Sequence, residues 1–319
     1  MKGPEMMKGM ELSREFYRTY GEPMLREQFP ELLPYLAAGL TGSGSECFGY
    51  DDEISRDHDF ETGFCLFLPG EEIVDRRTAF QLERAYAKLP KEFGGVSRPL
   101  MQPAGGARRG VLRTADFFME KTGTPDGTLT MRQWLTIPSP VLAEAVNGEI
   151  WEDRYGEVTR IREKLVCWPD DIRKKKLAGQ LLLMAQSGQY NYTRCIRHGE
   201  EAAAQLAVTE FVKSTMETVF LLNSAYMPYY KWSFRAMRAL PKLALEAELL
   251  EYLLTTGNEG PMAEEKYDVI EGIAADVIEE LQEQELTEAI CGDLEKHAYS
   301  VNDRITDSEL RNMHVLAAV

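Results

Sequence analysis

The stretch GLTGSGSECFGYDDEISRDHDF, residues 39–60, carries most of what the sequence says about this protein. Its last part, Asp57-His58-Asp59, runs directly into the apolar segment 60–70, which has the composition of a β-strand and ends at a Pro-Gly pair. Successive side chains of a strand point to opposite faces, so Asp57 and Asp59 would share one face and His58 would lie on the other. Paired carboxylates are ligands that Mg²⁺ prefers. We therefore predict a metal site at Asp57 and Asp59, and a buried, hydrogen-bonded His58.

The first part of the stretch predicts an anion-binding turn. Gly44 lacks a Cβ, so the backbone can approach a ligand closely, and the neighbouring amides and the Ser45 hydroxyl can donate to phosphate oxygens. Arg56 is expected either to steer phosphate or to pair with the acidic residues 51–53, which are expected to form a solvated loop. Together the two parts could hold a nucleoside triphosphate with its metal.

Composition limits the classes of protein to consider. The chain has 319 residues, 36 Lys and Arg, 52 Asp and Glu, and a net charge of −16, which disfavours bulk binding to nucleic acid or to anionic membranes. No run of 18 apolar residues occurs, and the start lacks the apolar core of a signal peptide. Five scattered cysteines without a C-x-x-C pair suggest neither a disulfide framework nor a zinc site. We expect a cytoplasmic globular protein.

Apolar periodicity divides the chain into two parts, residues 1–127 and 128–319. The first has short apolar runs, Gly-rich turns and helical patterns at 12–30 and 78–89. The second is almost purely helical after Pro169, with apolar residues at helical spacing over 170–187, 199–224, 229–255 and 263–290. The fold class expected is α+β: a small mixed-sheet domain followed by an all-α helical bundle.

Two cationic segments of the second part have competing interpretations. In YMPYYKWSFRAMR, residues 226–238, Lys231 and Arg235 lie four apart, so on a helix they share a face and could clamp a triphosphate. Alternatively, the aromatic residues around them anchor packing and the two cations merely cover that surface. The run KKK at 174–176 is interpreted as a solvated helix start.

The joint pattern resembles the signature of the nucleotidyltransferase superfamily, the DNA polymerase β-like fold. In that family a Gly-Ser pair is followed about ten residues later by D-x-D on a strand; here eleven residues separate Ser45 from Asp57. The phrase GSGSECFGYDDEISRDHDF, the later YMPYYKW and the helical second half are similar to an uncharacterised bacterial family of nucleotidyltransferases that carry a domain of unknown function.

The resemblance implies transfer of a nucleoside monophosphate from a nucleoside triphosphate to a hydroxyl acceptor, with release of pyrophosphate. It also implies two Mg²⁺ ions at Asp57 and Asp59. Many members add a third carboxylate from a neighbouring strand, but RRGVLRT, residues 108–114, has none. Asp116 follows it, and Glu210 or Glu217 of the helical part could instead supply a base.

The function is open to three interpretations. The acidic chain favours a small cationic acceptor molecule. Transfer to a protein or to an RNA end is the second interpretation, and a nucleotide-binding module without catalysis is the third.

Overall fold

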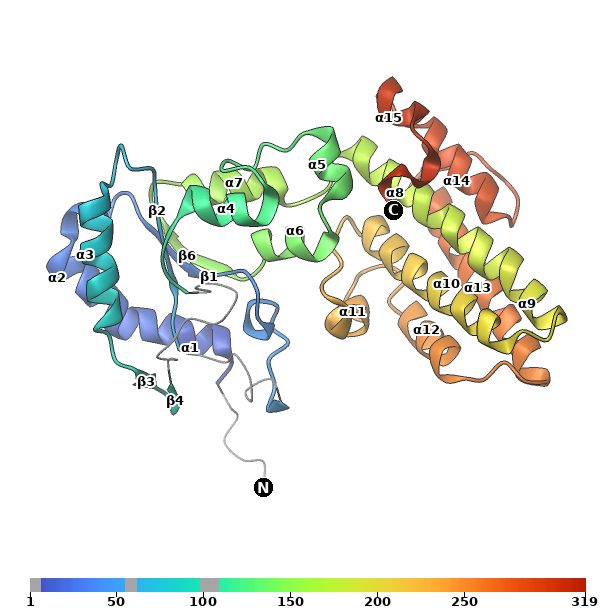
Figure 1. Cartoon of the computed structure of the whole chain (residues 1–319), viewed down its shortest axis with the longest axis horizontal. Coiled ribbons are helices and arrows are strands. Elements are labelled where there is room, and N and C mark those ends of the chain that lie inside the picture. The colour runs from blue at the N-terminus through green and yellow to red at the C-terminus, as the bar shows by residue number, and fades with distance from the viewer. Residues whose placement is uncertain (1–6, 55–61, 98–108) are drawn as a thin grey trace. The chain divides into compact units, whose positions relative to one another are not determined.

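The computed structural model describes residues 7–54, 62–97 and 109–319, which form two units (Figure 1). The first unit comprises residues 1–129 and 141–166, and the second comprises residues 130–140 and 167–319. The chain thus passes between the units three times. The expected boundary at 127/128 differs from this division because residues 141–166 belong to the first unit.

A four-stranded mixed sheet forms the centre of the first unit. Its order is β5-β2-β1-β6, from Gly110–Arg113, Cys65–Leu68, Ala37–Leu40 and Glu149–Asp153. β1 is antiparallel to both β2 and β6, whereas β2 and β5 are parallel. A separate two-stranded hairpin consists of β3 (Glu92–Phe93) and β4 (Val96–Ser97).

Helices cover the sheet. The chain begins with α1 (Gly9–Phe16), a π-helical turn (Tyr17–Gly21) and α2 (Glu22–Gln28), and α3 (Arg76–Ala87) follows β2. α4 (Thr114–Thr122) follows β5 directly, and α6 (Ser139–Val146) and α7 (Glu157–Leu165) flank β6. The predicted helices 12–30 and 78–89 correspond to α1–α2 and α3.

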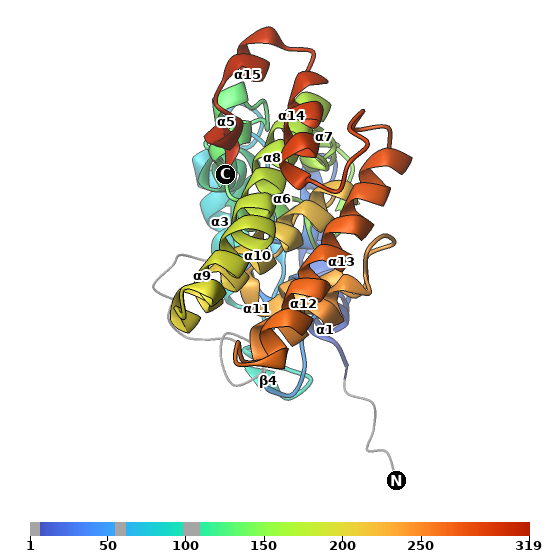
Figure 2. The ribbon, with the colours of Figure 1, turned by 90° about the vertical axis from the view of Figure 1, so that its right-hand side faces the viewer.

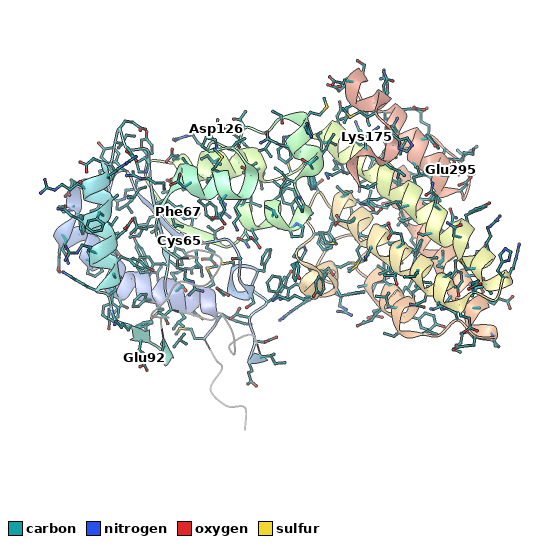
Figure 3. The ribbon with its side chains drawn as sticks, viewed as in Figure 1. Cys65, Phe67, Glu92, Asp126, Lys175 and Glu295 are labelled. Atoms are coloured by element: carbon teal, nitrogen blue, oxygen red, sulfur yellow. The ribbon has the colours of Figure 1, made fainter. Side chains whose placement is uncertain are left out.

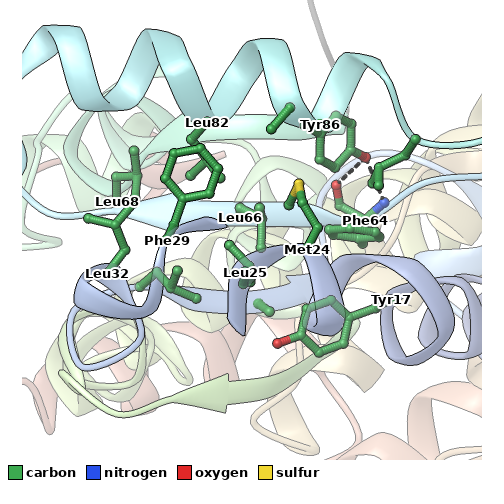
Figure 4. Close-up of a cluster of buried hydrophobic side chains, with 14 of the residues drawn as sticks. Tyr17, Met24, Leu25, Phe29, Leu32, Phe64, Leu66, Leu68, Leu82 and Tyr86 are labelled. Carbon is green, nitrogen blue, oxygen red and sulfur yellow. Dashed lines mark hydrogen bonds between the residues drawn. The ribbon is translucent and has the colours of Figure 1, made fainter. Parts of the chain in front are cut away.

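Strand β2 is buried along its whole length because both of its faces are covered. Leu66 and Leu68 belong to a core with α2 and α3 (Figure 4), and the hydroxyl of Tyr86 in α3 donates to the Phe64 carbonyl oxygen, at 2.8 Å. Phe67 alternates to the other face, where its ring lies 5.3 Å from that of Phe117 in α4. Figure 3 labels Cys65 and Phe67 on this strand.

The second unit is all-α, which confirms the expected fold class together with the mixed sheet of the first unit. Its long helices are α8 (Asp170–Met184), α10 (Glu201–Leu222) and α13 (Pro261–Glu283), which Figure 2 shows side by side. The shorter elements are α5 (Met131–Thr136), a π-helical segment (Ala185–Tyr192), α9 (Thr193–Arg197), α11 (Tyr230–Met237), α12 (Glu246–Thr255), α14 (Leu294–Asp303), α15 (Ser308–Asn312) and a 3₁₀ turn (Val315–Ala318). Among the described residues, no helix combines the length and apolarity that crossing a bilayer requires.

Two helix predictions in this unit were wrong in extent. The single helix expected over 229–255 is two helices, α11 and α12, because Pro241 cannot continue a helix and Leu243 has a φ of 56°. The helix expected to reach residue 290 ends at Glu283, and Glu285 there has a φ of 55°.

The cationic run 174–176 is not a solvated helix start. Lys175, labelled in Figure 3, is fully buried, and its ammonium donates to the side-chain oxygen of Asn302 at 2.8 Å and to the Met313 carbonyl oxygen at 2.7 Å. Consecutive helical residues point in directions about 100° apart, so three adjacent lysines of a packed helix cannot all face water. Burial lowers the pKa of Lys175.

Candidate functional site

The glycine turn, residues 42–45, follows β1 at the edge of the sheet where β2 begins. Gly39 of β1 pairs with Cys65, the first residue of β2. Gly42 and Gly44 have φ values of 105° and 132°, which residues other than glycine rarely adopt. A Cβ on Gly44 would lie 2.6 Å from Oε1 of Glu46. Glycine is therefore required at position 44 for two independent reasons.

The carboxamide of Asn147 holds the glycine turn in place. Its Oδ1 accepts the Gly42 N–H at 2.9 Å, and its Nδ2 donates to the Gly42 carbonyl oxygen at 2.8 Å. The Thr41 hydroxyl donates to the Asn147 carbonyl oxygen at 2.9 Å, and the Gly148 N–H donates to the Cys47 carbonyl oxygen at 3.0 Å. The turn is thus tied to the connection between α6 and β6.

A further support comes from α7. Arg162 donates to the carbonyl oxygen of Asn147 at 2.6 Å and also to that of Val146. Its guanidinium is largely buried, and this burial lowers the pKa of Arg162. The segment 141–166, which sequence periodicity assigned to the helical part, therefore builds the support of the glycine turn.

A buried ion pair lies directly under the turn. Nη2 of Arg109 donates to Oε1 of Glu46, and the two side chains are 6% and 4% exposed. Arg109 immediately precedes β5, so the pair joins the turn after β1 to the start of β5. The adjacent Cys47 thiol has a raised pKa, because burial and the Glu46 charge outweigh the opposing charge of Arg109.

The acidic loop is only partly solvated. Asp52 and Glu53 are exposed, as expected, but Asp51 is 3% exposed. Oδ2 of Asp51 accepts the N–H of Gly9, the first residue of α1, at 2.8 Å, and its carbonyl oxygen accepts from the Lys8 ammonium. The expectation of a solvated loop is therefore wrong for Asp51, which satisfies a helix-terminal N–H.

The predicted metal and phosphate ligands are only partly within the described residues. Gly44 and Ser45 lie in the glycine turn, and Ser45 is buried. Arg56, Asp57 and Asp59, with His58 between the carboxylates, lie outside the described residues. In the described part of the chain there is no group of three or more His, Cys, Asp and Glu side chains that could hold a metal ion.

Lys231 and Arg235 are both exposed on α11, in the second unit. The helix predicted after Pro228 exists, and the spacing places both cations on one face. The Lys231 ammonium lies 4.4 Å from the ring centre of Trp232. Their proposed contact with a triphosphate remains a prediction.

The three carboxylates considered as a third acid lie in different places. Asp116 is in the first turn of α4, and Glu210 is exposed on α10. Glu217, also on α10, lines a cavity of the second unit. Sequence inspection missed Glu46, Arg109, Asn147 and Arg162, because nothing local to these residues indicates partners up to about a hundred positions away.

Comparison with known proteins gives one match to a family model and one similar solved structure. Residues 134–233 match the model of a domain of unknown function, DUF4037, which confirms the expected resemblance to a family of that kind over this segment. No curated protein matches the chain. Among solved structures, the chain is similar to the crystal structure of a nucleotidyltransferase-like protein from Exiguobacterium sibiricum 255-15, with 11% sequence identity and a TM-score of 0.38, over 90% of this chain and 81% of that one.

Proposed function

We propose that this protein is a metal-dependent nucleotidyltransferase that moves a nucleoside monophosphate from a nucleoside triphosphate to a hydroxyl of a small acceptor. The observation that carries the proposal is the glycine turn beside the start of β2. Gly42 and Gly44 adopt conformations suited to glycine where β2 begins, and the D-x-D sequence comes shortly before β2 in the chain.

In this proposal the turn binds the triphosphate. The backbone amides of the turn and the Ser45 hydroxyl are the proposed donors to the phosphate oxygens. Asn147 and the Glu46–Arg109 pair fix the turn before any ligand arrives, so little ordering is needed on binding. Lys231 and Arg235 are proposed as additional phosphate contacts.

The donor set suits magnesium. Asp57 and Asp59 provide hard carboxylate oxygens, and these two residues would hold the metal. Two Mg²⁺ ions bound there would supply activation of the nucleophile and neutralisation of the leaving group. The net charge of −16 favours a cationic acceptor over a nucleic acid.

Thermal unfolding with and without ligand tests the proposal. Wild type and the Asp57→Asn, Asp59→Asn double variant are heated with each nucleoside triphosphate, in the presence and absence of Mg²⁺. A ligand that binds only the folded state raises Tm. We expect a magnesium-dependent rise for at least one nucleotide that the double variant loses.

A charge-matched control distinguishes the loss of a specific metal site from a general change in the charge of the protein. The Glu83→Gln, Glu92→Gln double variant removes the same two charges from exposed positions of the first unit and should keep the rise. Equal shifts in both double variants, or none in wild type, would contradict the proposal. Binding without release of pyrophosphate in an acceptor screen would favour the non-catalytic module, which the lack of a carboxylate on β5 also favours.

A further inference from the structure

The second unit contains a cavity of about 400 Å³ that the proposed nucleotide site does not use. The segment 135–140, helices α8 and α10 and the 3₁₀ turn 315–318 form its walls. Every lining residue belongs to the second unit. We call it the helical-unit cavity. Its volume lies in the range of small-molecule sites.

Packing of aromatic rings stabilises one wall. Trp168 lines the cavity, and its ring centre lies 5.9 Å from that of Trp134 and 4.8 Å from that of Tyr226. The Ser139 hydroxyl oxygen accepts the N–H of Met227 at 2.7 Å, which joins the segment 135–140 to the loop before α11. The cavity is therefore bounded by residues that are themselves held by specific contacts.

Two titratable side chains line this cavity, Lys176 and Glu217, and the protein supplies partners for the Lys176 ammonium, although burial lowers the pKa of Lys176. Its ammonium donates to the carbonyl oxygens of Leu135 at 2.9 Å and Ala318 at 3.3 Å, and lies 4.9 Å from the ring centre of Trp168. Both carbonyls belong to the last turn of a short helix, α5 or the 3₁₀ turn, where cations are stabilised.

The Glu217 carboxylate has no comparable hydrogen-bond partners in this unit. Across residues 130–140 and 167–319, all of which the structure describes, its carboxylate makes no hydrogen bond or close ion pair. Burial raises the pKa of Glu217 to about 7, and the nearby charge of Lys176 only partly opposes this. The remaining cavity walls contribute no titratable side chain. A carboxylate that lines a cavity and receives no donor from the protein can accept one from a molecule bound there.

We propose that the helical-unit cavity binds a small organic cation, whose ammonium group donates to the Glu217 carboxylate while its apolar part packs against Leu135, Ile137 and Leu221. Ammonium is the complementary group because it supplies both the missing charge and the missing donors. The three apolar side chains line the same cavity. This site is independent of the proposed nucleotide transfer.

Three probes of equal length and different charge test the proposal: n-butylammonium, n-butanol and butyrate. Binding is followed by calorimetry and by tryptophan fluorescence, since Trp168 lines the cavity. We expect n-butylammonium to bind wild type more tightly than the other two. Glu217→Gln should weaken this binding by about tenfold or more, whereas Glu210→Gln, at an exposed position of the same helix, should leave it unchanged.

The pH dependence provides a readout that a structural role would not give. Because the Glu217 pKa is about 7, the ionised fraction, and with it the affinity for n-butylammonium, should rise about tenfold from pH 6 to pH 8 in wild type only. Four outcomes would each overturn the proposal. The first two are tighter binding of butyrate than of n-butylammonium, and equal binding of n-butanol and n-butylammonium. The others are an unchanged affinity for n-butylammonium in Glu217→Gln, and no binding of any probe up to about 0.1 M.

Discussion

Asn147 pairs with Gly42 as a neighbouring strand would, accepting its N–H and donating to its carbonyl oxygen at 2.9 and 2.8 Å. A side-chain amide has the same donor and acceptor groups as a peptide, so it can satisfy the backbone at a position where the sheet has already ended. The conformation of the glycine turn therefore depends on a residue 105 positions away.

Replacing Asn147 should loosen the turn. Asn147→Asp keeps an acceptor for the Gly42 N–H but places a carboxylate against the Gly42 carbonyl oxygen. We therefore expect the free energy of unfolding to fall by about 1–3 kcal/mol. Hydrogen exchange followed by mass spectrometry should show faster exchange in peptides covering residues 37–48. Unchanged exchange there would show that the two hydrogen bonds contribute little to the turn.

Gly44→Ala should destabilise the first unit more than Gly49→Ala. Both glycines have positive φ. At Gly49, with a φ of 71°, alanine is strained by about 1–2 kcal/mol. Gly44, with a φ of 132° and a ψ of 143°, lies outside the left-handed helical region, and alanine there is strained by at least as much. Only at position 44 would the new Cβ also meet the Glu46 carboxylate; nothing lies within 4 Å at position 49. Urea denaturation of the two variants measures the difference, and equal losses would argue against the contact with Glu46.

The Glu46–Arg109 pair should show strong coupling in a double-mutant cycle. Glu46→Gln or Arg109→Met alone removes one side of a buried ion pair, at a cost of about 3–5 kcal/mol in the free energy of unfolding. The double variant leaves no charge and should lose less than the sum of the two single variants. Additive losses by urea denaturation would mean that the pair does not act as a unit.

Glu217→Gln should stabilise the second unit in a pH-dependent way. Below pH 4.5 the Glu217 carboxyl is protonated in both folded and unfolded chains and contributes no difference. Between about 4.5 and 7 only the folded chain retains the proton, so wild-type stability falls as pH rises through this window. The variant has no carboxyl group at this position, so its free energy of unfolding at pH 8 should exceed that of wild type by on the order of 1–3 kcal/mol.

Urea denaturation at pH 4.5, 6 and 8 checks this trend against Glu210→Gln, whose stability should follow that of wild type. A gain that is independent of pH would attribute the stabilisation to packing rather than to the ionisation of Glu217.

The helices could be predicted because their pattern is local. Apolar residues every three to four positions mark α3, α8 and α10 within about three residues of their observed ends. The positive-φ glycines of the turn were also predictable in kind, since GSGS before an acidic loop is typical of a tight turn.

Long-range relationships could not be predicted in the same way. β6 reads Glu149-Ile-Trp-Glu-Asp, has no buried residue and is flanked by helical patterns, so only its pairing with β1 defines it as a strand. Lys175 was misassigned because its partners, Asn302 and Met313, lie more than a hundred residues later. A single sequence does not show which distant polar group will meet a buried charge.

The pairing of β1 with β6 also sets an order for folding during synthesis. β1 ends at Leu40, and its partner on that side begins only at Glu149, after the chain has already made residues 130–140 of the other unit. At a synthesis rate of roughly 5–20 residues per second, β6 is synthesised on the order of 5–20 s after β1, and until then one side of β1 has no partner strand. We therefore expect a nascent chain of this protein to expose an unpaired strand edge for seconds, and to depend on ribosome-associated chaperones more than a chain whose sheet is contiguous in sequence.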